Sequence, residues 1–147
     1  NLVVRSVFAV VSHDHGKTWK TLDYVAGSEE ASNSGIEIAL NESTAHAVWM
    51  QDREGQKTRV IAATLDLQTA NWTGAATRID TKLVENTRSE VPTIVRTTNG
   101  VVVAAWVDFR DIRPNIYMSA SYDRGLSWTP PQPVGEPGRI SMGWPKL

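Results

Sequence analysis

The stretch Ser12–Trp19, "SHDHGKTW", returns near the other end of the chain as Ser121–Trp128, "SYDRGLSW". Both copies keep the frame Ser-x-Asp-x-Gly-x-(Thr/Ser)-Trp, whereas His13 and His15 of the first copy have no counterpart in the second. A metal site at His13, Asp14 and His15 would also need further ligands and supporting hydrogen bonds. Because the frame persists without the histidines, we interpret it as a structural turn and predict no metal site.

Each residue kept in the frame has a role in a tight turn between two strands. An Asp or Ser side chain can accept the backbone N–H groups that such a turn leaves unpaired. The glycine supplies a positive φ, and the tryptophan covers the turn as the outgoing strand begins. The residues expected to form these turns are Ser12, Asp14, Gly16, Thr18, Trp19, Ser121, Asp123, Gly125, Ser127 and Trp128, with a partial copy at Thr64, Asp66 and Trp72.

The tryptophans of these frames reveal an internal repeat. Trp19, Trp72 and Trp128 follow one another at intervals of 53 and 56 residues, and within the repeat Trp49 matches Trp106. A period in the low fifties fits one four-stranded blade of a β-propeller.

Four short strands are expected in each full repeat, and no segment shows sustained helical periodicity. Asn99-Gly100 predicts a two-residue hairpin turn between the first two strands of the second repeat. The prolines of its last strand are acceptable only at a sheet edge. The expected strands are 35–40, 45–50, 58–64 and 71–77 in one repeat, and 91–97, 101–108, 115–121 and 127–134 in the next.

The predicted fold class is therefore all-β, an incomplete β-propeller of about three four-stranded antiparallel blades. Residues 1–147 would form one propeller segment, with a half blade at 1–27, blades at 33–79 and 89–135, and the first strand of a further blade at 139–147. Propellers close with about four to eight blades, so this chain is not expected to close alone. It would be a fragment, or one of several chains of a cleaved propeller, or a unit completed by a symmetric copy, in a homo-oligomer. We favour a fragment.

Composition narrows the function classes. The chain has 147 residues, 41% hydrophobic and 21% charged, with a net charge of −1, which argues against a nucleic-acid partner. No stretch approaches the ~20 apolar residues of a membrane span, and no signal peptide opens the sequence. The absence of cysteine excludes disulfides. The abrupt apolar start suggests a mature, trimmed or excised piece, and nothing in the sequence indicates a cofactor.

The two complete frames resemble the Asp-boxes, or BNR repeats, of sialidase-like β-propellers. This resemblance implies that the boxes lie at the turn between the third and fourth strands, on the face away from the substrate site. It also implies an extracytoplasmic or secreted protein.

The opposite face would carry the loops between second and third strands, together with the segments between blades. Carboxylates near arginines could in principle hydrolyse glycosides or hold an acidic sugar, although such pairs more often fasten neighbouring loops. The candidate binding residues on this loop face are Asp52, Arg53, Glu90, Asp108, Arg110, Asp111 and Arg113.

The sialidase resemblance does not extend to a catalytic set. Sialidases use an Arg-Ile-Pro motif, two further arginines, a Tyr–Glu pair and an acid Asp. Here the nearest string, Ile112-Arg113-Pro114, has another order. Glu90 is the candidate glutamate, but Trp106 and Val107 occupy the region where that pattern would place its arginine. We therefore assign no catalytic residue.

The buried-looking tryptophans and one histidine have structural interpretations. Trp49 and Trp106 end apolar strands and are expected in the core rather than as sugar-stacking platforms. His46 lies in an apolar strand and is expected to be a hydrogen-bonded core or rim histidine.

Three functional hypotheses remain. The first is a non-catalytic scaffold or recognition module that binds a glycan or a protein through the loop face. The second is a portion of a sialidase-like glycoside hydrolase whose other catalytic residues lie outside this chain. The third is a purely structural set of blades that supports an adjoining domain.

Overall fold

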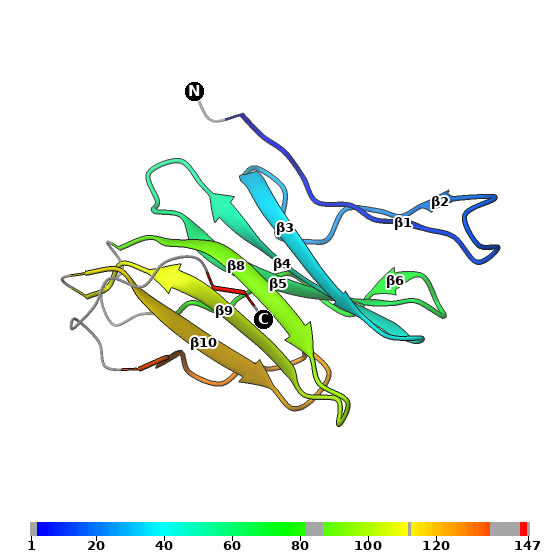
Figure 1. The fold of residues 1–147 in the computed structure, drawn as a ribbon. Helices are drawn as coiled ribbons and strands as arrows, with labels where there is room; N and C mark the ends of the chain where they lie inside the picture. Colours follow the sequence, from blue (N-terminus) through cyan, green and yellow to red (C-terminus); the bar gives the residue numbers. More distant parts are fainter. Residues whose placement is uncertain (1–2, 82–86, 112, 136–144, 147) are drawn as a thin grey trace.

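A computed structural model describes residues 3–81, 87–111, 113–135 and 145–146 (Figure 1). Within these residues every regular element is a strand, and the strands form three antiparallel sheets, which confirms the expected all-β class. The first sheet contains β1 (Val10–Val11) and β2 (Lys20–Thr21). The second contains β3 (Ser32–Leu40), β4 (Thr44–Asp52), β5 (Arg59–Asp66), β6 (Asn71–Trp72) and β7 (Thr77–Arg78). The third contains β8 (Ser89–Arg96), β9 (Val102–Asp108), β10 (Asn115–Ser121) and β11 (Gln132–Pro133).

Neighbours in the sequence are neighbours in each sheet, as in a meander. The second sheet has the order β3-β4-β5-β6, with β7 also paired to β5, and the third has the order β8-β9-β10-β11. The first sheet has only the β1–β2 hairpin. The strand expected at 139–147 lies outside the described residues, apart from 145–146.

The hairpin turn predicted at Asn99-Gly100 is longer than expected. Arg96 pairs with Val102, and the Thr97 N–H donates to the Val101 carbonyl, so three residues form the loop. The Gly100 N–H returns to the Thr97 carbonyl, and Gly100 has φ +90°. This is the three-residue hairpin with a left-handed third position, which also places a glycine after an asparagine.

The fourth strands are interrupted rather than continuous. Residues 73–76 separate β6 from β7, and in the third sheet only Gln132–Pro133 of the expected strand 127–134 pairs with β10. Pro130 and Pro131 lack the N–H that a ladder needs, which limits pairing at this edge.

The second sheet buries apolar side chains on both of its faces. Val48, Val60 and Ala62 pack against the third sheet in a cluster that includes Trp106, whereas Trp49 belongs to the cluster on the opposite face. That second cluster also contains side chains next to the β1–β2 hairpin. Both tryptophans are fully buried, which confirms that they belong to the core.

The two complete frames form turns with the same hydrogen bonds. In the first, the Gly16 N–H donates to Ser12 Oγ at 2.8 Å, and the Thr18 N–H and hydroxyl donate to the two oxygens of Asp14 at 2.8 and 2.7 Å. The Ser12 hydroxyl itself donates to Asp14 Oδ1. We call these segments, Ser12–Trp19 and Ser121–Trp128, the aspartate turns.

The second aspartate turn repeats this pattern on Ser121 and Asp123. Gly125 and Ser127 supply the equivalent N–H groups at 2.7 and 2.8 Å, and the Ser127 hydroxyl donates to the second carboxylate oxygen. In both turns, hydrogen bonds from the side chain and then the backbone of the Thr or Ser lower the pKa of the aspartate to about 2. The carboxylates are therefore bound within their own turns.

The partial copy differs by one residue from the sequence match. The Thr73 N–H bonds the Thr64 carbonyl as the Thr129 N–H bonds the Ala120 carbonyl, so the residue after Thr64, Leu65, takes the place of Ser121. Thr64 is therefore not a turn residue. The expected equivalence of Thr64 with Ser121 is therefore wrong by one residue. The middle turn lacks the glycine, and Asp66 instead accepts the backbone N–H groups of residues 68 and 69, each at 2.9 Å.

Thr64 instead binds a buried histidine. Its hydroxyl lies 3.0 Å from His46 Nδ1, and Thr44 Oγ1 lies 3.4 Å from His46 Nε2. His46 is 1% exposed, which confirms a core histidine with hydrogen-bond partners. Gly125 of the third sheet sits directly against Thr64 and His46, so the second aspartate turn seats on the neighbouring sheet.

The contact of Gly125 with Thr64 and His46 predicts that alanine substitution destabilises the chain more at Gly125 than at Gly16. Gly16 and Gly125 have nearly equal φ, +83° and +85°, so alanine strains either backbone by about 1–2 kcal/mol. A Cβ at Gly125 would in addition strike the Thr64 hydroxyl, whereas one at Gly16 meets only Trp19 at 3.7 Å. We expect Gly125→Ala to lower the unfolding free energy by about 1–3 kcal/mol more than Gly16→Ala, measured by urea denaturation. Equal losses would contradict the contact.

A second prediction concerns pH. Burial, followed by the positive charge of Arg96, lowers the pKa of His46 in the folded chain. The unfolded chain then binds the extra proton first, so stability is present above the unfolded value of about 6.5 and is lost as pH falls below it. Urea denaturation at pH 7.5 and 5.5 should show this loss. His46→Gln should reduce it, while His13→Gln, at an exposed site, should leave it unchanged.

Candidate functional site on the loop face

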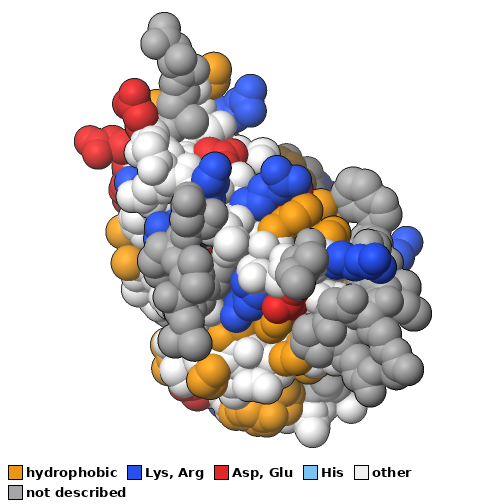
Figure 2. Space-filling model, turned by 90° about the vertical axis from the view of Figure 1, so that its left-hand side faces the viewer, with side chains coloured by type: hydrophobic (Ala, Val, Ile, Leu, Met, Phe, Trp, Pro, Cys, Tyr) orange, Lys and Arg blue, Asp and Glu red, His pale blue; other side chains and the backbone are white. Residues whose placement is uncertain are grey.

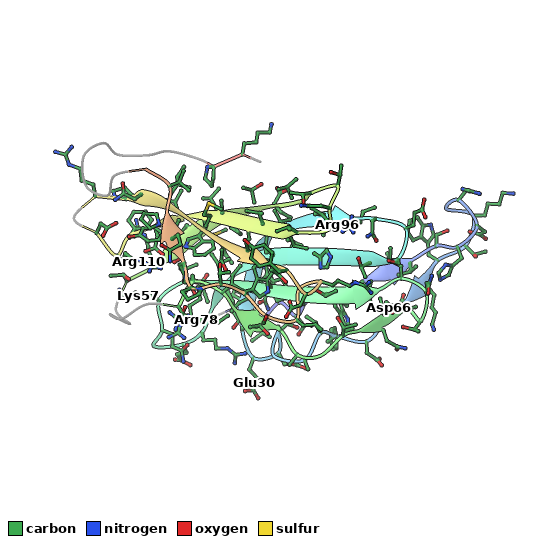
Figure 3. All side chains as sticks on the ribbon, turned by 90° about the horizontal axis from the view of Figure 1, so that it is seen from below. Glu30, Lys57, Asp66, Arg78, Arg96 and Arg110 are labelled. Atoms are coloured by element: carbon green, nitrogen blue, oxygen red, sulfur yellow. The ribbon has the colours of Figure 1, made fainter. Side chains whose placement is uncertain are left out.

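The loops between second and third strands lie at one end of the sheets and the aspartate turns at the other, because the strands are antiparallel. In Figure 3 Arg110, Lys57 and Arg78 lie at one end of the molecule, and Asp66 and Arg96 lie at the other. Figure 2 looks onto the end that carries Arg110 and shows several basic side chains spread over it. The candidate residues expected on the loop face belong to this end.

Asp108 and Arg110 form a buried ion pair in the third sheet. Asp108 is fully buried, and its Oδ2 accepts hydrogen bonds from Arg110 Nη2 at 2.8 Å, Trp106 Nε1 at 2.9 Å and the Ser89 hydroxyl at 3.0 Å. Its Oδ1 accepts from Arg110 Nε and N. Arg110 Nη2 also reaches the carbonyl of Asp80, in the segment between the second and third sheets, at 3.5 Å.

The second sheet holds an uncharged version of the same arrangement. The indole of Trp49 donates to Asn33 Oδ1 at 2.7 Å, which also accepts from the Gln51 amide at 3.1 Å. Arg53 Nε donates to Gln51 Oε1 at 3.1 Å, and Arg53 Nη2 reaches the Gly27 carbonyl at 2.8 Å. In each sheet, therefore, an arginine ties the loop to the segment that arrives from the preceding sheet.

We call this connection, made by Arg53 in the second sheet and by Arg110 in the third, the arginine latch. The internal repeat contains a sequence signal for it beyond the matched tryptophans and arginines. The frame Trp-x-(Gln/Asp)-x-Arg occurs at Trp49–Arg53 and again at Trp106–Arg110. Matching the tryptophans and arginines alone left out the middle position. Asp108 accepts hydrogen bonds from both the Trp106 indole and the Arg110 guanidinium. Gln51 accepts from Arg53 and reaches the Trp49 indole through the shared acceptor Asn33, so in each sheet the middle residue joins the core to the loop.

Asp111 lies beside the same ion pair but uses other partners. Its Oδ2 accepts the Tyr117 hydroxyl at 3.0 Å and the Asn115 amide at 2.9 Å. The Arg110 guanidinium lies over the Tyr117 ring, 4.2 Å from its centroid. Burial, then the hydrogen bond to Asp111, raises the pKa of Tyr117 to about 12. This phenol therefore stays protonated and is a poor nucleophile.

The remaining candidates are separated from this cluster by their contacts. Asp52 accepts the Thr58 hydroxyl at 2.6 Å across its own loop. Glu90 pairs with Arg88 Nε at 2.9 Å, and Arg88 stacks over the ring of Phe109. Arg113 is exposed. The structure thus brings Asp108, Arg110 and Asp111 together and leaves Asp52, Arg53, Glu90 and Arg113 apart from this cluster.

A shallow pocket of about 220 Å³ opens beside the loop of the second sheet. Three arginines, Arg53, Arg59 and Arg78, contribute to its lining together with Gln51 and Gln56. Guanidinium groups favour carboxylate, phosphate and other anionic partners because their planar donors match paired oxygens. None of the candidate site residues expected from the sequence was Arg59 or Arg78. Arg59 begins β5 and Arg78 ends β7, and the pairing of these two strands brings the arginines to the same pocket.

No group of three His, Asp or Glu side chains converges on a metal position in the described part of the chain. Asp14 directs its oxygens to its own turn. In that same part, no helix is long and apolar enough to cross a membrane.

No protein-family model matches the sequence, and a search of curated proteins finds no relative. Solved structures are similar in fold. The α-L-arabinanase of Penicillium chrysogenum, complexed with arabinobiose, matches 92% of this chain and 42% of its own at 15% identity, with a TM-score of 0.60. A protein of unknown function from Dyadobacter fermentans matches 74% of this chain and 38% of its own at 12% identity, with a TM-score of 0.55.

The sialidase of Trypanosoma rangeli, complexed with the inhibitor DANA, matches 84% of this chain at 11% identity, with a TM-score of 0.53. The chain is a segment of a β-propeller. At these identities the likeness concerns the fold, and it confirms the sialidase-like propeller architecture expected from the repeat. The chain spans less than half the length of the arabinanase and a quarter of the sialidase.

Removing the arginine of either latch is expected to lower the unfolding free energy, and the two losses should be unequal. Arg110→Ala removes two charge-assisted hydrogen bonds from the buried Asp108 carboxylate and should lower the unfolding free energy by about 3–5 kcal/mol. Arg53→Ala removes hydrogen bonds from neutral acceptors and should lower it by about 1–2 kcal/mol. Urea denaturation of both variants tests this order. An Arg110→Ala loss no larger than that of Arg53→Ala would contradict a buried ion pair.

Proposed function

We propose that this chain is a non-catalytic segment of an Asp-box β-propeller, which acts as a scaffold and presents its loop face for recognition. The observation that supports this most directly is the use of the loop-face carboxylates as hydrogen-bond acceptors within the fold. Asp108 and Asp111 hold Trp106, Arg110 and Tyr117, in contacts that stabilise the loop. A general acid or nucleophile needs a carboxyl group directed at a substrate.

The resemblance to Asp-boxes gains support from the hydrogen bonds of the two aspartate turns. Their Ser, Asp and Thr or Ser side chains act on the turn backbone and lie at the end opposite the loop face. By the same resemblance, we propose that the protein is extracytoplasmic.

Recognition, in this proposal, occurs at the arginine-lined pocket beside Arg53, Arg59 and Arg78. Its chemistry favours an acidic glycan or an acidic segment of a protein over a neutral ligand. This shallow pocket suits a surface contact rather than an enclosed substrate.

The alternative is a portion of a sialidase-like glycoside hydrolase. It is favoured by the fold likeness to an arabinanase and a sialidase. Because this chain spans only 42% and 25% of those chains, a catalytic set could be completed by residues beyond it. In that case Glu90 is the glutamate to test, because it is partly exposed on the loop face and pairs only locally with Arg88. The remaining catalytic residues would lie outside these 147 residues.

The two proposals separate in a paired assay of hydrolysis and binding. We expect the chain to release no fluorophore from a fluorogenic sialoside or arabinoside above the buffer rate. We expect a glycan array to show acidic glycans bound in preference to their neutral counterparts, with about tenfold weaker binding by Arg53→Ala, as for the loss of one charge-assisted contact.

Two other results would change the conclusion. Hydrolysis that disappears in Glu90→Gln, while Glu54→Gln keeps it, would establish the enzyme instead. An array at background level for every glycan would leave a purely structural segment.

A further inference from the structure

An apolar groove runs along the outer side of β3, where the second sheet faces away from the third. Its volume is about 270 Å³. Ile36, Ile38 and Leu40 line it from β3 and are 49%, 58% and 61% exposed, and Phe8 and Val10 border it from the first sheet. Figure 1 shows the N-terminal segment and the β1–β2 hairpin on this side of the second sheet.

The third sheet shows what covers this position in a completed pair of sheets. Ile38 pairs with Ala47 and Ile94 pairs with Ala104, and each alanine stands two residues before the buried tryptophan of its strand. Ile38 and Ile94 are therefore equivalent residues of the repeat. Ile94 is only 8% exposed because β8 packs against β3, β4 and β5 of the second sheet.

The first sheet lacks the strands that would do the same for Ile38. Its β1–β2 hairpin corresponds to the third and fourth strands of the other sheets, because the first aspartate turn joins β1 to β2 as the second joins β10 to the outgoing chain. Arg5 and Thr58 stand at equivalent positions of the repeat, because each bonds the chain that enters the next sheet. The Arg5 N–H donates to the Ala31 carbonyl, and the Thr58 carbonyl accepts from the Ser89 N–H. Among the described residues, β1 pairs only with β2, so its other edge is unpaired.

We propose that two antiparallel strands from a further repeat of the same protein occupy this groove. One strand would pair with the free edge of β1 and the other with that strand, as β9 pairs with β10 and β8 with β9. Their alternating apolar side chains would pack on Ile36, Ile38 and Leu40. This source is favoured because the site has the shape of the chain's own repeat, and because the similar arabinanase and sialidase chains are more than twice as long. The inference goes beyond the proposed function, since it concerns a surface remote from the loop face.

The repeat itself supplies the probe for a test. Residues 32–57, which hold β3, β4 and most of the following loop, would be placed directly before Arg5, in the position that they have before Thr58. Because the chain has no cysteine, Ile38→Cys then reports cover of the groove by its rate of thiol labelling. Leu126→Cys is the matched control, an apolar residue 67% exposed at the second aspartate turn.

We expect the extension to slow labelling at Ile38→Cys and amide exchange in β1 by about tenfold or more, as for a sheet edge that becomes paired. Labelling at Leu126→Cys should not change. Ile38→Glu should abolish the protection of β1 in the extended chain, whereas Leu126→Glu should retain it. A second extended chain, with residues 89–113 before Arg5, tests the same groove if the first one misfolds.

Two outcomes would overturn the proposal. One is unchanged labelling and exchange in both extended chains while they remain folded by circular dichroism. The other is a dimer of the unmodified chain in light scattering that Ile38→Glu dissociates and Leu126→Glu does not, which would assign the groove to a second copy.

Discussion

Burial of apolar side chains on both faces of the second sheet is the interaction on which the rest of the chain depends. Trp49 points to one side of β4 and Val48 to the other, and each meets a different neighbouring sheet. A sheet of this kind cannot be stable with one face in water, so sheets must stack in series. Because consecutive sheets lie next to one another in the stack, short segments are enough to connect them. The aspartate turns satisfy their own backbone, and the arginine latches fasten each loop to the segment that enters from the sheet before it.

Features that depend on a few neighbouring residues could be predicted from the sequence. The aspartate turns are such features, because serine, aspartate and glycine act on N–H groups within four residues. Sheet order followed from the repeat. The position of Thr64 could not be found in this way, since its role is set by His46, eighteen residues away on the paired strand. The same limit applies in part to the loop face, where Trp106 lies two residues from Asp108 but Ser89 comes from the neighbouring strand β8.

The loop face illustrates how a fold shared with glycosidases can be used without their chemistry. A fold alone does not determine activity, which requires a particular set of groups directed at one substrate position. Here the carboxylates beside Arg110 complete the interior of the sheet and support its loop. Three guanidinium groups line the pocket at this end, and such groups bind anions well and do not transfer protons near neutral pH. Binding is thus the chemistry that the exposed residues of this end favour.

The tryptophans at the starts of the fourth strands give the stack a direction. Trp72 donates its indole N–H to the carbonyl of Asp23, in the segment that follows the first sheet, and Trp128 packs against the cluster shared with the second sheet. Trp19, with no earlier sheet beside it, is 62% exposed. The second and third sheets therefore each present the tryptophan of the fourth strand to the preceding sheet and a different surface to the following one. Such head-to-tail contacts are not self-complementary, so a lone segment has two unlike ends, and its contacts either close into a ring or continue as an open array.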